Sequence, residues 1–400
     1  MKVLKPFYYD DFKCIGEECI DNCCSNNWRI YIDEKTYKKY KRLKGQWGKK
    51  INSNISKVRS NSNYLQYGKI KLKNGVCALL SEEKLCTIHS ILGEEYLCNT
   101  CKIYPREIYK YGEIYERNLS MSCPEVARYI VKMKDKFYFN MEDEIIIDLD
   151  KEYITDNKQD ERLYNLLWHS RILAMEIIQF KEIELWKRII FLKLMVDKVQ
   201  KRIDENNYDN YDNLLNVLRE QIININVINS LDKISSSLDI KLKFIQNVLQ
   251  ARNNQGIFNL KYNELIDDYN ELFLKIDNSE NILEIISKYE TEFNDYLKTK
   301  ENILENLLIY LVYKYFMEAL NTKDVNKAVT KIIINYVMIK TFLLARYNKN
   351  NKELKEEDFV EIFYIFSRVV EHNSVFLNEL YKNIKEAGYD NINYVTILVR

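Results

Sequence analysis

The sequence contains very little glycine and proline, with nine glycines and three prolines in 400 residues. Both residues interrupt helices, so their scarcity predicts a mainly α-helical chain with short connections. The three prolines, Pro6, Pro105 and Pro124, all lie in the first third of the chain. Irregular structure is therefore expected in that third.

The net charge is also close to zero, since the chain has 60 basic and 59 acidic side chains. A chain without a net field is not drawn to nucleic acid or to anionic membranes. Residues 35–50 are locally rich in lysine, and a solvated helix face explains them more simply than a nucleic-acid patch. We predict neither nucleic acid nor membrane as a partner.

Long hydrophobic runs are missing as well. The first twelve residues, M-K-V-L-K-P-F-Y-Y-D-D-F, lack the apolar core of a signal peptide. The apolar stretch 189–196 is interrupted by Lys193 and is too short to span a bilayer. We therefore expect a cytoplasmic protein, whose thiols stay reduced.

The common catalytic loops do not occur. There is no G-x-S-x-G, no P-loop and no H-E-x-x-H, so hydrolase and nucleotide-triphosphatase functions have no motif support. None of the nine glycines forms G-x-G, the core of the usual dinucleotide-binding loop. A nucleotide-like ligand would need a different pocket, which the sequence does not locate.

Cysteine, by contrast, is concentrated near the N-terminus. The segment C-I-G-E-E-C-I-D-N-C-C holds Cys14, Cys19, Cys23 and Cys24 within eleven residues. Soft thiolates that are close in sequence can converge on one zinc or iron ion at about 2.3 Å. Free cysteines also fill small apolar spaces, but such filling rarely produces this density. Disulfides are disfavoured by an odd count of nine in a reducing compartment.

The other five cysteines follow within the next hundred residues: Cys77, Cys86, Cys98, Cys101 and Cys123. His89, three residues after Cys86, could add a nitrogen donor. So many thiols exceed the need of one tetrahedral ion. They suit an iron–sulfur cluster plus zinc, two metals, or one site with spare cysteines.

We predict two domains: a small, irregular, cysteine-rich metal-binding domain over 1–149 with a few short strands, and a larger helical domain over 150–400. The boundary is placed in the polar segment 150–161. The strand candidates are 28–32, 68–75, 113–119 and 144–149, with Asp33 as a helix cap and Asn-Gly as a tight turn.

Helical periodicity dominates the second domain. The strongest segment is 302–320, where apolar residues come in pairs at every fourth position and predict a helix buried on half its circumference. Other helices are predicted at 163–202, 214–224, 239–252, 257–276, 280–299, 324–346 and 356–385.

Several motifs carry a resemblance to a known family. The N-terminal cysteines followed by W-R-I-Y-I-D-E-K-T-Y resemble the C-x-x-C-x-x-C-C zinc- or iron-chelating superfamily and, within it, the FliB family of flagellin lysine-N-methylases. Residues 75–106, Cys123-Pro-Glu-Val-Ala-Arg, E-N-L-L-I-Y-L-V-Y-K-Y-F at 305–316 and S-R-V-V-E-H-N at 367–373 are also similar to that family.

The resemblance implies methyl transfer from S-adenosylmethionine to lysines of flagellin, with a cysteine-bound iron–sulfur cluster (4Fe-4S) or zinc. The x4 and x3 spacings of the first cysteines differ from the C-x3-C-x2-C of radical S-adenosylmethionine enzymes, so the motif does not support a radical mechanism. The implied metal ligands are Cys14, Cys19, Cys23, Cys24, Cys77, Cys86, Cys101 and Cys123, while Cys98 falls where relatives often carry another small residue.

A second group, Arg368, Glu371 and His372, has the i, i+3, i+4 spacing of neighbours on a helix. A lysine methyltransferase must hold a neutral, desolvated amine in line with the donor methyl, and a carboxylate can help to do so. With the resemblance, we predict these three as catalytic residues; an ordinary ion pair inside a helix is the alternative.

Two other classes of function remain open at this point. The metal could merely shape a surface in a non-catalytic protein-binding module, or the protein could serve redox chemistry or metal delivery. Methylation of flagellin, partner binding without turnover, and a reversible change in visible absorption would distinguish the three.

Overall fold

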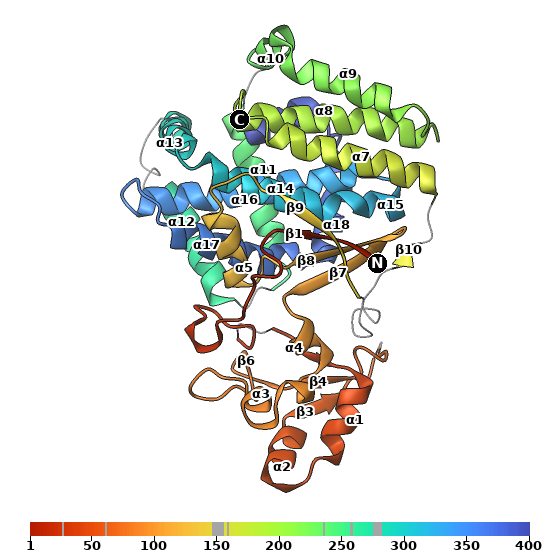
Figure 1. Ribbon diagram of the computed structural model, residues 1–400. Coiled ribbons are helices and arrows are strands. Elements are labelled where there is room, and N and C mark those ends of the chain that lie inside the picture. Colours follow the sequence, from red (N-terminus) through yellow and green to blue (C-terminus); the bar gives the residue numbers. More distant parts are fainter. Residues whose placement is uncertain are drawn as a thin grey trace.

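The computed structural model describes residues 1–25, 28–60, 62–145, 156–157, 160–234, 237–256, 259–274 and 282–400. A broad helical body stands on a narrower lobe formed by residues 13–105, here called the cysteine lobe (Figure 1). The predicted fold class is confirmed: the chain is mainly α, with small sheets and the cysteines in its N-terminal region. The segment 150–161 lies almost entirely outside the described residues, so the domain boundary stays a prediction.

A five-stranded mixed sheet lies between the lobe and most of the helices (Figure 1). Its order is β10 (Asp156–Asn157), β7 (Arg106–Tyr111), β8 (Ile114–Leu119), β1 (Lys2–Pro6) and β9 (Phe139–Asp143). β1 precedes the lobe in the sequence and pairs in parallel with β8, which follows the lobe. The chain therefore begins in this sheet, forms the lobe, and then returns to the sheet.

Only β8 of these strands matches a strand that the sequence predicts. β1, β7 and β9 were not predicted. β1 and β9 pair with strands far along the chain, whereas β7 was missed although it forms a hairpin with β8. In the candidate 144–149, residues 144 and 145 follow β9 without strand structure, and the remaining four lie outside the described residues.

Short elements make up the cysteine lobe: η1 (Gly16–Glu18), β2 (Tyr31–Ile32), α1 (Glu34–Arg42), α2 (Gly45–Ser53), β3 (Ile55–Lys57), β4 (Gly68–Ile70), β5 (Leu72–Lys73), β6 (Val76–Cys77), α3 (Thr87–Leu92), η2 (Glu94–Tyr96) and α4 (Asn99–Ile103). Two local predictions are confirmed. Asp33 caps α1 by accepting from the Thr36 amide at 2.8 Å. Asn74 and Gly75, both at positive φ, form the tight turn between β5 and β6.

The helical body contains α5 (Pro124–Lys132), α7 (Glu161–Ile178), α8 (Leu185–Asp204), α9 (Tyr211–Ile223), α10 (Ile225–Leu231), α11 (Leu238–Asn253), α12 (Leu260–Leu274), α13 (Ile282–Lys298), α14 (Glu301–Tyr315), η3 (Phe316–Glu318), α15 (Ala319–Thr322), α16 (Val325–Lys349), α17 (Glu356–Phe366), η4 (Ser367–Glu371), α18 (Ser374–Glu386) and α19 (Ile392–Val399). The predicted helix 163–202 is two helices, and 356–385 is broken by the π-helical turn η4.

The centre of the body is built from α14 and α16. Leu307, Leu308 and Leu311 on α14 are fully buried, and each such side chain contributes about 1.5–3 kcal/mol by leaving water. α16 is the one helix among the described residues that is long and apolar enough to cross a membrane. However, 89% of its most apolar window is buried inside the protein, which is the environment of a core helix.

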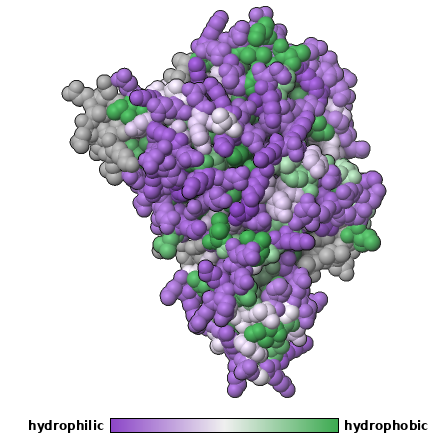
Figure 2. Space-filling view, turned by 60° about the vertical axis from the view of Figure 1, so that its left-hand side comes forward, coloured by the Kyte–Doolittle hydropathy of each residue, from purple (hydrophilic) through white to green (hydrophobic). Residues whose placement is uncertain are grey.

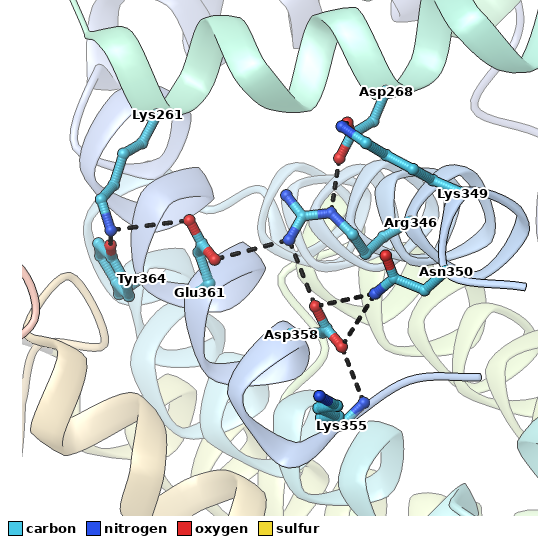
Figure 3. A network of polar contacts seen from close by, with 9 residues as sticks. All are labelled: Lys261, Asp268, Arg346, Lys349, Asn350, Lys355, Asp358, Glu361 and Tyr364. Atoms are coloured by element: carbon cyan, nitrogen blue, oxygen red, sulfur yellow. Dashed lines mark hydrogen bonds and ion pairs between the residues drawn. The ribbon is translucent and has the colours of Figure 1, made fainter.

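A buried polar network ties α16 to its neighbours (Figure 3). Arg346 Nε donates to Asp268 of α12 at 2.6 Å, and its Nη1 reaches Asp358 of α17 at 3.3 Å. Glu361 continues the network to Lys261, whose Nζ donates to the Tyr364 hydroxyl at 2.8 Å. Tyr364 forms one end of this network. It lies on the side of α17 that faces the cysteine lobe.

On the face drawn in Figure 2, hydrophilic residues cover most of the body, and hydrophobic residues form small, separate patches. One such patch lies on the narrow lobe at the bottom of the view. Scattered apolar surface of this kind is ordinary for a folded chain. The surface therefore gives less information about function than the interior.

Candidate functional site

Six cysteines gather around the small apolar core of the cysteine lobe. Cys77 and Cys98 are buried in it, and Cys24, Cys86 and Cys101 pack against it. The sixth, Cys23, shares a hydrogen bond with the thiol of Cys24, which also bonds to Cys77. Cys98 therefore belongs with this group, because its Sγ lies 3.6 Å from Cys101 Sγ.

Local backbone structure brings these thiols together. The Cys77 amide donates to the Cys24 carbonyl at 2.7 Å, which joins the first cysteine segment to β6. Cys86, Cys98 and Cys123 each stand immediately before a helix, as the N-cap residues of α3, α4 and α5. Amides of the first helical turn point at such positions and favour a thiolate there.

Pairing of thiols shifts their acidity in opposite directions. The hydrogen bond from Cys24 lowers the pKa of Cys23 to about 7, and the Arg368 guanidinium acts in the same direction. The same bond raises the pKa of Cys24. Likewise, the bond between Cys98 and Cys101 lowers the pKa of Cys98 and raises that of Cys101. One thiol of each pair is thus favoured as the thiolate, which is the form that binds a metal.

The remaining three cysteines lie toward the helical body. Burial raises the pKa of Cys123 to about 12, and the neighbouring Cys19 adds to the rise. Cys19 in turn feels both Cys14 and Cys23, so it connects the two groups of thiols. The eight predicted ligands therefore fall into two adjoining sets, with Cys98 added to the first.

Chemically, the thiol set suits a soft metal such as zinc or iron. Within the described residues, no three cysteine, histidine or carboxylate side chains stand in an arrangement that could hold an ion. His89, considered as a nitrogen donor, is exposed at the surface. His169 is a packed residue, bonded through Nδ1 to the Asn165 carbonyl oxygen at 2.8 Å.

Arg368 fastens the cysteine lobe to the helical body. Its guanidinium forms an ion pair with Asp21 at 2.9 Å and also donates to the Asp21 carbonyl at 2.8 Å. A third bond reaches the Ser122 carbonyl at 2.7 Å, next to Cys123. The guanidinium also lies over the Tyr364 ring, 5.1 Å from its centroid, at the end of the network in Figure 3.

Glu371 is directed to a different partner, Lys314 of α14, at 2.8 Å. Lys314 also donates to Glu107 of β7 at 3.0 Å, so one lysine bridges the buried carboxylate of Glu371 and the half-buried one of Glu107. Burial opposes the charge of Glu371, but Lys314 and His372 outweigh it and lower the pKa of the carboxyl. Burial also opposes the charge of Lys314, but the two carboxylates raise its pKa well above the ordinary value.

His372 takes a third direction. Its Nε2 lies 3.0 Å from Ser120 Oγ, and a chain of hydroxyls continues through Ser122 to Tyr104. Trp28 of the cysteine lobe packs edge-on against the imidazole at 5.5 Å between ring centroids. Burial and the nearby Lys314 lower the pKa of His372, so the neutral imidazole is favoured.

The π-helical turn η4 explains why these three side chains diverge. An i, i+3, i+4 set faces one way on an α-helix, but the wider turn changes the direction of each side chain. The structure nevertheless places all three between the cysteine lobe and the body, a region here called the junction. The sequence alone did not identify Asp21, Glu107 and Lys314 as residues of this site. Lys314 could have been noticed, because it is a lysine within the apolar segment 302–320.

Comparison with known proteins identifies the family of this chain. The C-terminal domain of FliB lysine N-methylases matches residues 171–398. The chain belongs to the FliB lysine N-methylase family. The family resemblance predicted from the motifs is thereby confirmed, and the matched domain of this methylase contains Lys314, Arg368, Glu371 and His372.

Relatives extend the similarity over the whole chain. Two lysine-N-methylases, from Salmonella choleraesuis strain SC-B67 and Salmonella typhimurium strain LT2, are each 25% identical over 394 residues, or 96% of this methylase and 95% of the relative. The flagellar biosynthetic protein FliU of Salmonella muenchen is 35% identical over 136 residues, covering 33% of this chain and 79% of FliU. No solved structure matches.

Proposed function

We propose that this protein transfers methyl groups from S-adenosylmethionine to lysines of flagellin. The observation that carries the proposal is membership of the FliB lysine N-methylase family, together with similarity to lysine-N-methylases along nearly the whole chain. The flagellar name of the FliU relative supports flagellin as the protein substrate.

The reaction sets clear chemical requirements. The amine of the target lysine attacks the methyl carbon, and the carbon–sulfur bond breaks. The sulfonium sulfur takes the electron pair and becomes the thioether of S-adenosylhomocysteine. The amine must be neutral and aligned with the breaking bond, and the methylated nitrogen releases one proton.

We place the protein's contribution at the junction. His372 is held neutral and bonded to Ser120, so it can accept the released proton and pass it along the hydroxyl chain. Glu371 and Lys314 fix the turn that carries this histidine. Arg368 acts as a positioning residue, because it holds the cysteine lobe against the turn.

We further propose that the cysteines bind an iron–sulfur cluster or zinc. The ligands would be Cys14, Cys19, Cys23, Cys24, Cys77, Cys86, Cys101 and Cys123, with Cys98 as a further member. The donor chemistry fits, since thiolates are the usual ligands of both groups. The bound group would supply a cross-link for the lobe or, as an iron–sulfur cluster, a site of electron exchange.

The test is anaerobic purification with metal and sulfide analysis, followed by a methylation assay on purified flagellin. We expect bound metal, methyl incorporation and release of S-adenosylhomocysteine. Colourless protein containing zinc and no sulfide would exclude the iron–sulfur assignment. Flagellin binding without methyl transfer, by protein with its metal intact, would instead support a non-catalytic binding module.

A further inference from the structure

A cavity of about 550 Å³ lies in the helical body, at a distance from the junction. It is lined by parts of α8, α11, α13, α14, α16 and α19, including Trp186 and Tyr336. Its volume falls within the range of about 300–1,000 Å³ that is usual for small-molecule sites. Glu301, at one end of α14, borders it, whereas Lys314 of the junction lies about 20 Å along that helix.

The cavity lining carries charges of both signs, but they are not equally satisfied. Each lining carboxylate has a cationic partner within the protein: Glu184 with Lys187 at 3.2 Å, Glu290 with Lys241 at 2.8 Å, Asp295 with Lys298 at 2.8 Å, and Glu301 with Arg188 at 2.6 Å. The cavity therefore offers little to a cationic ligand.

Lys340 of α16 differs from these paired charges. In the part of the chain that the structure describes, it forms no ion pair or hydrogen bond, and its Nζ lies 6.0 Å from the centroid of the Tyr336 ring. It borders both this cavity and a second, narrow one beside it. A half-buried ammonium at a cavity wall without a partner is unfavourable, so the position favours an anion.

Arg400 adds a second available cation at the cavity wall. Its guanidinium donates to the backbone carbonyl of Ile234 at 2.8 Å and lies over the Trp186 ring at 5.2 Å. Neither contact is with a side-chain carboxylate, and the described residues form no ion pair with its guanidinium. Of the four cationic side chains that line the cavity, Lys241 and Lys298 are paired with carboxylates. The other two, together with the two aromatic rings, suit an anionic group attached to a flat or apolar body.

We propose that this cavity binds a small organic anion, whose carboxylate or phosphate group pairs with Lys340 while its body packs on Trp186 and Tyr336. Two sources share this chemistry. One is the amino-acid carboxylate of S-adenosylmethionine or its product; this source rests on the proposed activity but places the methyl donor at this cavity instead of at the junction, because the molecule is too short to extend from one to the other. The other is a phosphate-bearing ligand unrelated to methyl transfer.

Protonation of Lys340 gives the proposal a specific signature. Burial and the nearby Lys241 lower the pKa of Lys340 to about 7, while Glu290 opposes them. The other ionisable groups around the cavity are Glu184, Asp295, Lys298, Glu301, Tyr336 and Arg400. An anion bound at Lys340 favours the charged ammonium, so binding at pH 8 should take up a proton.

Isothermal titration calorimetry tests this on the full-length protein, with S-adenosylhomocysteine and inorganic phosphate as separate probes. Measurements at pH 8 in two buffers of different ionisation enthalpy give the proton uptake. We expect at least one probe to bind with uptake approaching one proton. Lys340→Met should lose that uptake and weaken binding about tenfold or more. Lys298→Met, on the same cavity but paired with Asp295, is the matched control and should change little.

Binding of S-adenosylhomocysteine with these properties would identify the anion as the donor's carboxylate, and binding of phosphate would identify the second source. Failure of both probes to bind, or equal binding by wild type and Lys340→Met, would overturn the proposal. A wild-type protein that methylates flagellin while Lys340→Met binds normally would leave the proposed function standing and reject this site alone.

Discussion

The cysteine lobe and the helical body bury their interiors in different ways. The lobe packs short elements around a small apolar core in which cysteines take part directly. The body surrounds α14 and α16 with a large, continuous core. Because small cores give little stability, we expect the proposed metal to stabilise the lobe, whereas the body should not need it. The two regions should therefore respond differently to the same perturbation.

The largest expected difference follows from metal removal. Structural metal sites couple binding to folding, with apparent free energies of about 10–16 kcal/mol in small zinc domains. A chelator, or Cys101→Ser, should therefore abolish amide hydrogen-exchange protection in the lobe and leave α14 and α16 protected. Mass spectrometry of exchanged peptides measures both regions in one sample.

His89→Ala is the control for that experiment, since the histidine is exposed and lies close to Cys86 in sequence. It should change neither metal content nor exchange. Full protection of the lobe after complete metal loss would show that the metal does not stabilise the lobe.

The second-largest expected effect is the loss of stability when a buried ion pair of the body is broken. Arg171 of α7 forms a bidentate pair with Glu116 of β8, at 2.8 and 2.5 Å, and both side chains are almost fully buried. Arg171→Met leaves a buried carboxylate unpaired and should reduce the free energy of unfolding by about 3–5 kcal/mol. Urea denaturation measures this loss of unfolding free energy.

Arg219→Met gives the comparison for that variant, because Arg219 pairs with Glu176 on the exposed surface. That pair should contribute only about 0.2–1 kcal/mol. Equal losses from the two variants would mean that burial does not decide the strength of these pairs.

The connection between the two regions should have an intermediate effect. In a double-mutant cycle of Asp21→Asn and Arg368→Gln, we expect a coupling energy of about 0.5–3 kcal/mol, since the two side chains form a buried ion pair. Thermal unfolding of the four proteins provides it. Additive effects would place the attachment of the lobe elsewhere.

The last expected effect concerns pH. The pKa of Lys340 is lowered to about 7 in the folded chain, from an ordinary 10.5. Between these values the unfolded chain binds more protons, so the free energy of unfolding rises with pH through this window and is lowest below pH 7. Lys340→Met should remove that rise. An unchanged pH profile would show that Lys340 is charged in the folded protein.

Local features of this fold were predictable from sequence. The cap at Asp33 and the Asn74–Gly75 turn each depend on neighbouring residues, and each is found in the structure. The prediction that the helix in 302–320 is buried on half its circumference was wrong, because α14 lies at the centre of the body and is buried on all sides. The strands β1 and β9 were missed because their pairing partners lie far away in sequence. Arg368 and Glu371 were recognised as notable, but not their partners Asp21 and Lys314.

The sequence by itself determined the helical class, the concentration of thiols before residue 124 and, through its motifs, the methylase family. These properties follow from composition and local order. Only the tertiary structure joined Cys77 to Cys24, turned three neighbouring side chains at η4 toward three separate partners, and left Lys340 without a counter-ion among the described residues. Such outcomes depend on which distant segments meet, and burial then decides which charges are paired.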